Sequence, residues 1–183
     1  MGPGRRSRPD RLPLGHAVRM TEDEVLDLLR SLPGTTVVTA SKASGAPQAA
    51  EGDSFAIFDP DGDLPPARQR PFTTVVVRDV PGWDVESRLD RADVFRVNLE
   101  VGRTRYAELL GHETAEHADR RDAYDYGAFD VLLPHPQYAV QGWVSVVCPG
   151  SGTGDLVRRL VAEAHAAAAR RWQRRRSVPA GEV

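Results

Sequence analysis

Cysteine and lysine are almost absent from this chain. Cys148 is its one cysteine and Lys42 its one lysine among 183 residues. A single cysteine excludes an intrachain disulfide and the cysteine clusters of structural zinc sites. It also favours a cytoplasmic location, which is the compartment we expect.

Long apolar runs are missing too. No stretch approaches the roughly 20 apolar residues that span a bilayer, so we expect no contact with a membrane. The N-terminus is basic but lacks the continuous apolar segment of a secretory signal. Hydrophobic residues still make up 40% of the chain, and a domain of about 150 residues folds without a metal or disulfide staple.

Charge is distributed unevenly along the chain. Residues 1–19 and residues 170–183 each carry five arginines and one acid, whereas residues 20–169 carry 14 basic and 24 acidic side chains, a formal charge of −10. Nucleic-acid affinity rests on basic side chains that neutralise phosphates. The acidic middle of the chain therefore disfavours nucleic acid as a partner.

Three regions follow from composition and periodicity. Residues 1–19 combine glycine, proline and arginine without apolar periodicity, so we expect a disordered basic extension, and the natural start is either Met1 or Met20. Residues 20–175 form a single predicted α+β domain, and residues 176–183 a disordered tail. The domain begins at a capping box, because Thr21 and Glu24 have the spacing at which each side chain bonds the other's backbone.

The order of predicted elements defines the fold class. Helical spacing after Thr21 is followed by short strand patterns, then by a helix over Arg103–Leu110, a last strand and a long C-terminal helix. We expect an α+β fold, an antiparallel sheet of about five strands packed by the N- and C-terminal helices. Asp84–Arg91 is expected to be a short helix. The predicted strands are Thr35–Ala40, Phe55–Phe58, Phe72–Arg78, Val94–Val101 and Gly142–Cys148.

Val94–Val101 has the clearest strand pattern. Phe95, Val97, Leu99 and Val101 alternate with polar residues, so the two sets point to opposite faces of the sheet. Arg96 and Asn98 then lie either on a solvated sheet face or on the polar floor of a site for an anionic or amide-bearing ligand, with the Arg96 guanidinium as a forked donor.

A second polar group lies before the last strand. Pro134 and Pro136 stiffen the segment that carries His135 and Tyr138, which suits either a binding site or a rigid connection in which His135 bonds the backbone. Trp143 fits the core or a pocket wall. The candidate ligand-binding residues are Arg96, Asn98, His135, Tyr138 and Trp143.

No catalytic residue and no cofactor are assigned. His112 and His117 lack the spacing of a zinc helix, and there is no nucleophile elbow, so no metal site is predicted. Pro149–Asp155 is glycine-rich but lacks the Gly-Lys-Ser/Thr ending of a phosphate loop, and we expect a flexible helix cap. An enzyme with His135 as general base is one alternative.

A second alternative is sequence-independent contact with nucleic acid through the end of the C-terminal helix. Its arginines also suit the negative pole of the helix dipole without any partner. The residues concerned are Arg170, Arg171, Arg174, Arg175 and Arg176.

Three segments resemble an actinobacterial family of unknown function: residues 52–66 (GDSFAIFDPDGDLPP), 95–103 (FRVNLEVGR) and 129–150 (FDVLLPHPQYAVQGWVSVVCPG). The resemblance extends from Met20 to Trp172. More distantly, the strand, helix, H-P-x-Y…G-W-V-x-V and helix order is similar to the MmcQ/YjbR-like proteins.

That distant likeness implies the double-wing fold, an α+β domain with an antiparallel sheet, and some of its members are described as DNA-binding. A fold does not transfer a function, and the resemblance supplies no catalytic residue. We therefore expect a non-enzymatic binding module whose partner is an unknown small molecule or protein.

Overall fold

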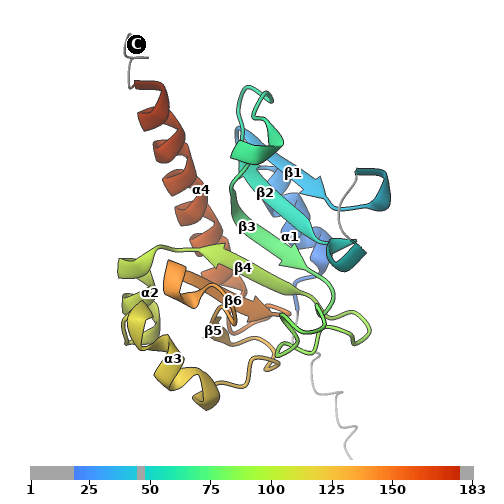
Figure 1. The fold of residues 1–183 in the computed structure, drawn as a ribbon, viewed down its shortest axis with the longest axis vertical. Helices are drawn as coiled ribbons and strands as arrows, with labels where there is room; N and C mark the ends of the chain where they lie inside the picture. The colour runs from blue at the N-terminus through green and yellow to red at the C-terminus, as the bar shows by residue number, and fades with distance from the viewer. Residues whose placement is uncertain (1–18, 45–47, 178–183) are drawn as a thin grey trace, which may run out of the picture.

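The computed structural model describes residues 19–44 and 48–177, in which helices pack against one antiparallel sheet (Figure 1). Within those residues six strands lie in the order β1-β2-β3-β4-β6-β5, and each neighbouring pair is antiparallel. The strands are β1 (Thr35–Thr39), β2 (Ser54–Phe58), β3 (Pro71–Val76), β4 (Arg96–Glu100), β5 (Leu132–Pro134) and β6 (Trp143–Val147).

The helices precede, interrupt and follow the strands. The α-helices of the described residues are α1 (Glu22–Arg30), α2 (Arg103–Leu110), α3 (His117–Arg120) and α4 (Gly154–Ser177). The short 3₁₀ helices are η1 (Lys42–Ser44), η2 (Gln48–Ala50), η3 (Pro66–Arg68), η4 (Thr114–Glu116), η5 (Arg121–Ala123) and η6 (Ala139–Gln141).

The α+β fold with terminal helices is confirmed, and within the described residues the sheet has six strands rather than about five. β5 escaped prediction because it has three residues and ends in Pro134, within the segment expected to be a rigid connection. The predictions for residues 1–18 and 178–183 lie outside the described residues. α4 continues to Ser177, so Arg176 is still helical.

The capping box at the start of α1 is present as predicted. The Thr21 hydroxyl accepts from the Glu24 amide at 3.1 Å, and the Glu24 carboxylate accepts from the Thr21 amide at 2.8 Å. These bonds satisfy backbone amides that a helix start otherwise leaves without a partner. Val25 and Leu29 are fully buried beneath this helix.

One face of the sheet packs against α1 and α4. In β3 and β4, Thr73 and Leu99 are paired and fully buried on that face, and Leu99 belongs to the same buried cluster as Val161 of α4. Because successive strand residues alternate between faces, the paired Thr74 and Asn98 point to the opposite side. That second face carries the candidate site.

Arg96 and Asn98 are each about 1% exposed. They therefore do not lie on the solvated sheet face that was one of their two expected environments. The second sheet face is covered here by residues 80–87, of which Asp84 and Ser87 bond Arg96, and by the segment around His135. The polar row is an interior one.

The predicted short helix at Asp84–Arg91 is wrong. Asp84 instead pairs with Val80 in an isolated antiparallel bridge, and Arg88 has a φ of 50°, in the left-handed region that breaks a helix. Side-chain bonds fix this segment, since the Asp79 carboxylate accepts from the Leu89 amide at 2.9 Å. Helical periodicity alone missed these longer-range bonds.

Candidate functional site

A pocket of about 490 Å³ lies on the second face of the sheet. Its floor is formed by β3, β4 and β6, and its walls by residues 80–84 and 135–141. We call it the aromatic pocket, and it brings together all five predicted ligand-binding residues. Its lining comprises Ala50, Asp53, Phe55, Pro71, Thr74, Val76, Val80, Trp83, Asp84, Arg96, Asn98, His135, Tyr138, Gln141 and Trp143.

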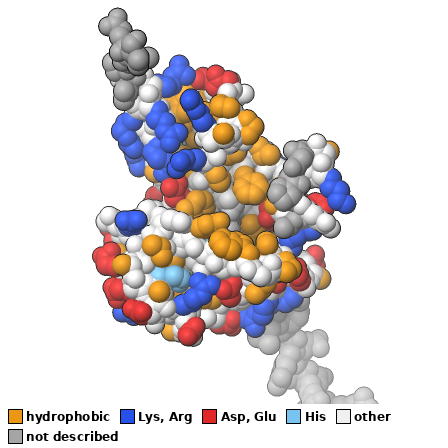
Figure 2. Space-filling model, viewed as in Figure 1, with side chains coloured by type: hydrophobic (Ala, Val, Ile, Leu, Met, Phe, Trp, Pro, Cys, Tyr) orange, Lys and Arg blue, Asp and Glu red, His pale blue; other side chains and the backbone are white. Residues whose placement is uncertain are grey.

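The pocket opens at a hydrophobic part of the surface. Figure 2 shows hydrophobic side chains gathered at the middle of this face, between the basic end of α4 and the charged surface around α2 and α3. Trp83 and Tyr138 are 56% and 41% exposed, which is unusual for large aromatic side chains. An exposed apolar rim of this kind is typical of a binding surface.

Aromatic rings line one wall. Trp83 and Tyr138 have ring centroids 6.4 Å apart, and His135 lies 4.9 Å from Tyr138 and 6.3 Å from Trp143. Trp143 is half-buried and forms a pocket wall, so it is not the core residue that one interpretation of the sequence favoured. Trp83, which the sequence did not single out as a ligand-binding residue, lines the pocket mouth.

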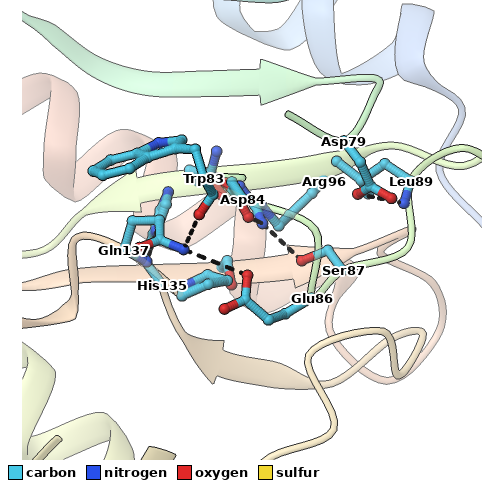
Figure 3. Close-up of polar contacts among 12 residues, drawn as sticks. Asp79, Trp83, Asp84, Glu86, Ser87, Leu89, Arg96, His135 and Gln137 are labelled. Carbon is cyan, nitrogen blue, oxygen red and sulfur yellow. Dashed lines mark hydrogen bonds and ion pairs between the residues drawn. The ribbon is translucent and has the colours of Figure 1, made fainter. Parts of the chain in front are cut away.

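A chain of hydrogen bonds forms the polar floor. The Arg96 guanidinium donates to both Asp84 carboxylate oxygens, at 3.0 and 2.5 Å, and to the Ser87 hydroxyl at 2.7 Å (Figure 3). Its Nε donates to the Asn98 amide oxygen at 2.8 Å, and the Asn98 amide nitrogen donates to Thr74 at 2.9 Å. Each hydrogen bond in this chain fixes the orientation of the next side chain.

This arrangement neutralises Arg96. Four of its five N–H donors are used by protein groups, and its partner Asp84 is only 13% exposed at the side chain. The guanidinium fork therefore binds Asp84 and is not open to an incoming anion, contrary to the role that the sequence suggested. Arg96 lines the pocket as a charge that is already paired.

His135 is 3% exposed and accepts hydrogen bonds at Nδ1 from the amides of Gln137 and Tyr138, at 3.0 and 3.2 Å. A neutral imidazole with Nδ1 as acceptor carries its proton on Nε2. Burial, with the nearby charges of Arg96 and His117, holds the pKa of His135 well below its usual range. At neutral pH this side chain is a hydrogen-bond donor.

Asp53 is a pocket residue that the sequence did not single out. Burial raises its pKa to about 6, against the lowering effect of a hydrogen bond that its carboxylate accepts from the Val77 amide at 3.0 Å. Val77 lies 24 residues further along the chain. No local pattern signals this placement, which depends on the pairing of β2 with β3.

A polar tie joins the two walls. The Gln137 side-chain amide donates to the Trp83 carbonyl oxygen at 2.6 Å and lies 3.4 Å from the Glu86 carboxylate (Figure 3). Arg121 in turn bonds Glu86 and the Pro136 carbonyl oxygen. Residues 83–86 and 136–137 are therefore held together over the polar floor.

The arginine-rich end of α4 lies apart from the polar floor. Arg171 pairs with Glu100 at 2.7 Å, and Arg176 pairs with Asp61 at 2.5 Å and stacks over Trp172. Arg170, Arg174 and Arg175 are exposed, and Figure 2 shows the basic patch that this end of the molecule presents.

The glycine-rich segment before α4 holds an internal anion. The Asp130 carboxylate accepts from the amides of Gly150, Gly152 and Thr153 at 2.7 to 2.8 Å, and from the Thr153 hydroxyl at 2.6 Å. Burial raises the pKa of Asp130, but these bonds outweigh it and lower the pKa. The segment is thus an ordered cap rather than a flexible one.

Two further properties concern the described residues as a whole. Across residues 19–44 and 48–177, no three or more His, Cys, Asp or Glu side chains are grouped in a way that could hold a metal ion. No helix in this part of the chain has the length and apolar character needed to cross a membrane.

Comparison with protein-family models matches residues 20–177 to a family of unknown function, DUF6194. Among solved structures, the chain is similar to the Deinococcus radiodurans protein DR2400, whose family-model domain is DUF419, a YjbR/MmcQ-like family. The two share 12% identity over 83% of this chain and 80% of DR2400, with a TM-score of 0.47.

The comparison with curated proteins finds no match. The resemblance to a family of unknown function is confirmed, and the distant likeness to MmcQ/YjbR-like proteins is met again in DR2400. At this identity and TM-score, the likeness to DR2400 carries no conclusion about function.

Proposed function

Because the chain belongs to DUF6194, a family of unknown function, we propose its role from the geometry of the pocket. The aromatic pocket binds a small molecule with a flat, uncharged, apolar body, and the protein acts as a binding module rather than an enzyme. The observation that carries this proposal is the aromatic wall standing over a polar floor whose buried arginine is already neutralised.

Size and lining favour a small molecule over a protein segment. Small-molecule sites are typically clefts of about 300–1,000 Å³ lined by apolar and aromatic side chains with a few polar groups. The volume of about 490 Å³ lies in this range. The rings of Trp83, Tyr138 and Trp143 offer faces and edges against which a flat body packs.

The floor favours an uncharged group. Arg96 and Asp84 cancel one another, and His135 is neutral. His135 Nε2–H can hydrogen-bond a ligand carbonyl or ring nitrogen. Burying such a group against this donor costs little, because its hydrogen bond to water is replaced.

The enzyme alternative is disfavoured by the same bonds. A general base needs a free lone pair directed at the substrate. The lone pair of His135 is at Nδ1, where two backbone amides already donate. Its Nε2 carries the proton, so His135 serves orientation and recognition in this proposal.

Phenylnaphthylamine, a neutral flat fluorophore that brightens in apolar surroundings, tests the proposal. We expect the wild-type protein to bind it with enhanced fluorescence, and Trp143→Ala to bind it roughly tenfold more weakly, since one lost aromatic contact is worth on the order of 1.4 kcal/mol. Val131→Ala is the matched control, because Val131 is 43% exposed and does not line the pocket.

Two outcomes would contradict the proposal. One is the absence of fluorescence enhancement with the wild-type protein. The other is equal affinity of the wild type and Trp143→Ala, which would put the fluorophore elsewhere on the apolar surface. Circular dichroism of both variants verifies that they remain folded.

A further inference from the structure

The aromatic pocket continues into a second hollow of about 420 Å³. Pro71, Gln141 and Trp143 line both hollows, so these three residues lie where the two meet. We call the second hollow the arginine cleft. Its lining comprises Arg70, Pro71, Glu100, Gln141, Trp143, Arg171 and Arg175.

The arginine cleft is strongly basic although the body of the chain is acidic. It contains three guanidinium groups and one carboxylate, that of Glu100, which pairs with Arg171 at 2.7 Å. Arg68 adds a fourth cation at an adjoining hollow of about 270 Å³ that Arg70 and Arg175 also line. In the described part of the chain, Arg68, Arg70 and Arg175 form no ion pair.

Two separate elements supply these arginines. Arg68 and Arg70 lie on η3 and the turn before β3, and Arg171 and Arg175 on the last turns of α4. The helix dipole explains arginines at the end of α4, but it does not explain two more on a facing segment. Like charges that converge on one hollow repel each other, and a bound anion removes that repulsion.

The hollow is also held in shape. Trp172 of α4 packs edge-to-face on Phe58 of β2, with ring centroids 5.9 Å apart. Arg171 is fixed by Glu100 at the end of β4. The α4 side of the cleft is thus anchored to the sheet rather than free to move apart.

We propose that the ligand of the aromatic pocket carries an anionic group, of the phosphate or sulfonate class, which the arginine cleft binds. This inference rests on the proposed function, since it identifies the chemical class of the ligand of the same site. Trp143 contacts the flat body on one side, and Arg70 and Arg175 donate to the anion on the other. Arginine forks match tetrahedral oxyanions by paired hydrogen bonds.

A matched pair of fluorophores tests this inference. Anilinonaphthalene sulfonate differs from phenylnaphthylamine chiefly by its sulfonate, so the affinity ratio of the two probes isolates the anion. We expect the sulfonate probe to bind the wild type roughly tenfold or more tightly than the neutral probe, because its sulfonate forms charge-assisted hydrogen bonds with the arginines. Added salt should reduce this advantage.

Two double variants separate the cleft from general surface charge. Arg70→Gln with Arg175→Gln should abolish the advantage of the sulfonate and leave the affinity for the neutral probe unchanged. Arg170→Gln with Arg174→Gln also removes two positive charges, both at exposed positions of α4 outside the cleft lining. This control should leave both affinities unchanged. Inorganic pyrophosphate should displace the sulfonate from the wild type.

The outcomes are distinguishable. Binding of the neutral probe without any advantage for the sulfonate overturns the anion inference and leaves the proposed function standing. Failure of the neutral probe with the wild type overturns the proposed function. Equal losses of sulfonate affinity in the two double variants indicate an effect of surface charge alone and overturn the anion inference. Loss of duplex DNA binding by Arg70→Gln with Arg175→Gln, without a change in sulfonate affinity, indicates a nucleic-acid contact and also overturns it.

Discussion

Arg96 shows how a single side chain can organise a site without being open to its ligand. It is about 1% exposed and bonds the carboxylate of Asp84, the hydroxyl of Ser87 and the amide of Asn98. Those bonds hold residues 84–87 against β4. Its effect on binding therefore acts through the shape of the pocket.

Arg96→Met should destabilise the protein by about 3–5 kcal/mol, because it leaves the Asp84 carboxylate poorly solvated and without its partner. Urea denaturation measures the loss. Arg105→Met is the control, since Arg105 is 37% exposed at the side chain and its pairs with Glu108 and Glu163 lie at the surface. It should cost no more than about 1 kcal/mol.

A companion change sharpens that prediction. Adding Asp84→Asn to Arg96→Met removes the uncompensated charge and should recover part of the lost stability. A double variant as unstable as Arg96→Met, or more so, would mean that packing of the arginine stem rather than charge pairing dominates.

Asp53 makes the stability of the folded protein depend on pH. Its folded pKa of about 6 lies above the ordinary 3.8, so between these values the folded state binds more protons than the unfolded state. The stabilisation is present below about pH 4 and is lost as pH rises through about 6. The buried histidines act in the opposite direction, because burial lowers the pKa of His135 and of His117.

Asp53→Asn isolates the carboxyl contribution, since the histidines are common to both proteins. The free energy of unfolding of the variant minus that of the wild type should rise between about pH 4 and pH 6 and then level off. Thermal or urea unfolding at several pH values measures it. A difference that stays constant over this range would show that the Asp53 pKa is ordinary.

At the scale of elements, the start of β6 is fixed by the end of β4. The Gly142 carbonyl oxygen accepts from the amides of Val101 and Gly102, both at 3.0 Å. Gly142 has a φ of 82°, and a Cβ there would lie 2.5 Å from the Gly102 carbonyl carbon. This close approach positions Trp143, the next residue.

Gly142→Ala should therefore be much more destabilising than a strained glycine substitution alone. Gly62→Ala is the matched control, because Gly62 has a φ of 70° but a Cβ added there would meet no atom within 4 Å. The control should cost about 1–2 kcal/mol for the left-handed backbone. Thermal unfolding compares the two, and equal losses would mean that the contact with Gly102 relaxes freely.

Local patterns predicted most of the secondary structure and less of the tertiary contacts. The capping box of Thr21 and Glu24 and the alternation in β4 depend on neighbours in sequence, and both are present in the structure. The interior position of Arg96 depends on Asp84, which the sequence assigned to a helix. Three-residue β5 gives too short a pattern to recognise.

At the scale of the whole molecule, the five candidate residues were chosen from two strands and one connection, and the structure gathers them at one pocket. Antiparallel pairing of β4 with β6 does this, since it sets Asn98 beside Ser145 and Glu100 beside Trp143. Asp53 and Trp83 were missed because their positions depend on contacts with distant segments. The same holds for Arg68 and Arg70, which face α4 across the cleft.

The uneven charge of the sequence also acquires a location. The net formal charge of residues 20–169 is −10, yet Arg68 and Arg70 of that region join Arg171 and Arg175 of α4 around one hollow. An isolated basic site in an acidic body focuses the electrostatic field there. Counting charges along the chain showed the acidic body but not this concentration.

Trp143 lines both the aromatic pocket and the arginine cleft, so a substitution at this position changes both. A smaller side chain there would merge two compartments into one trough, lengthening the space while removing the surface against which a ring stacks. The residue at position 143 therefore sets both the length of the site and its shape. A substitution that admits longer ligands would also discriminate less well among short ones.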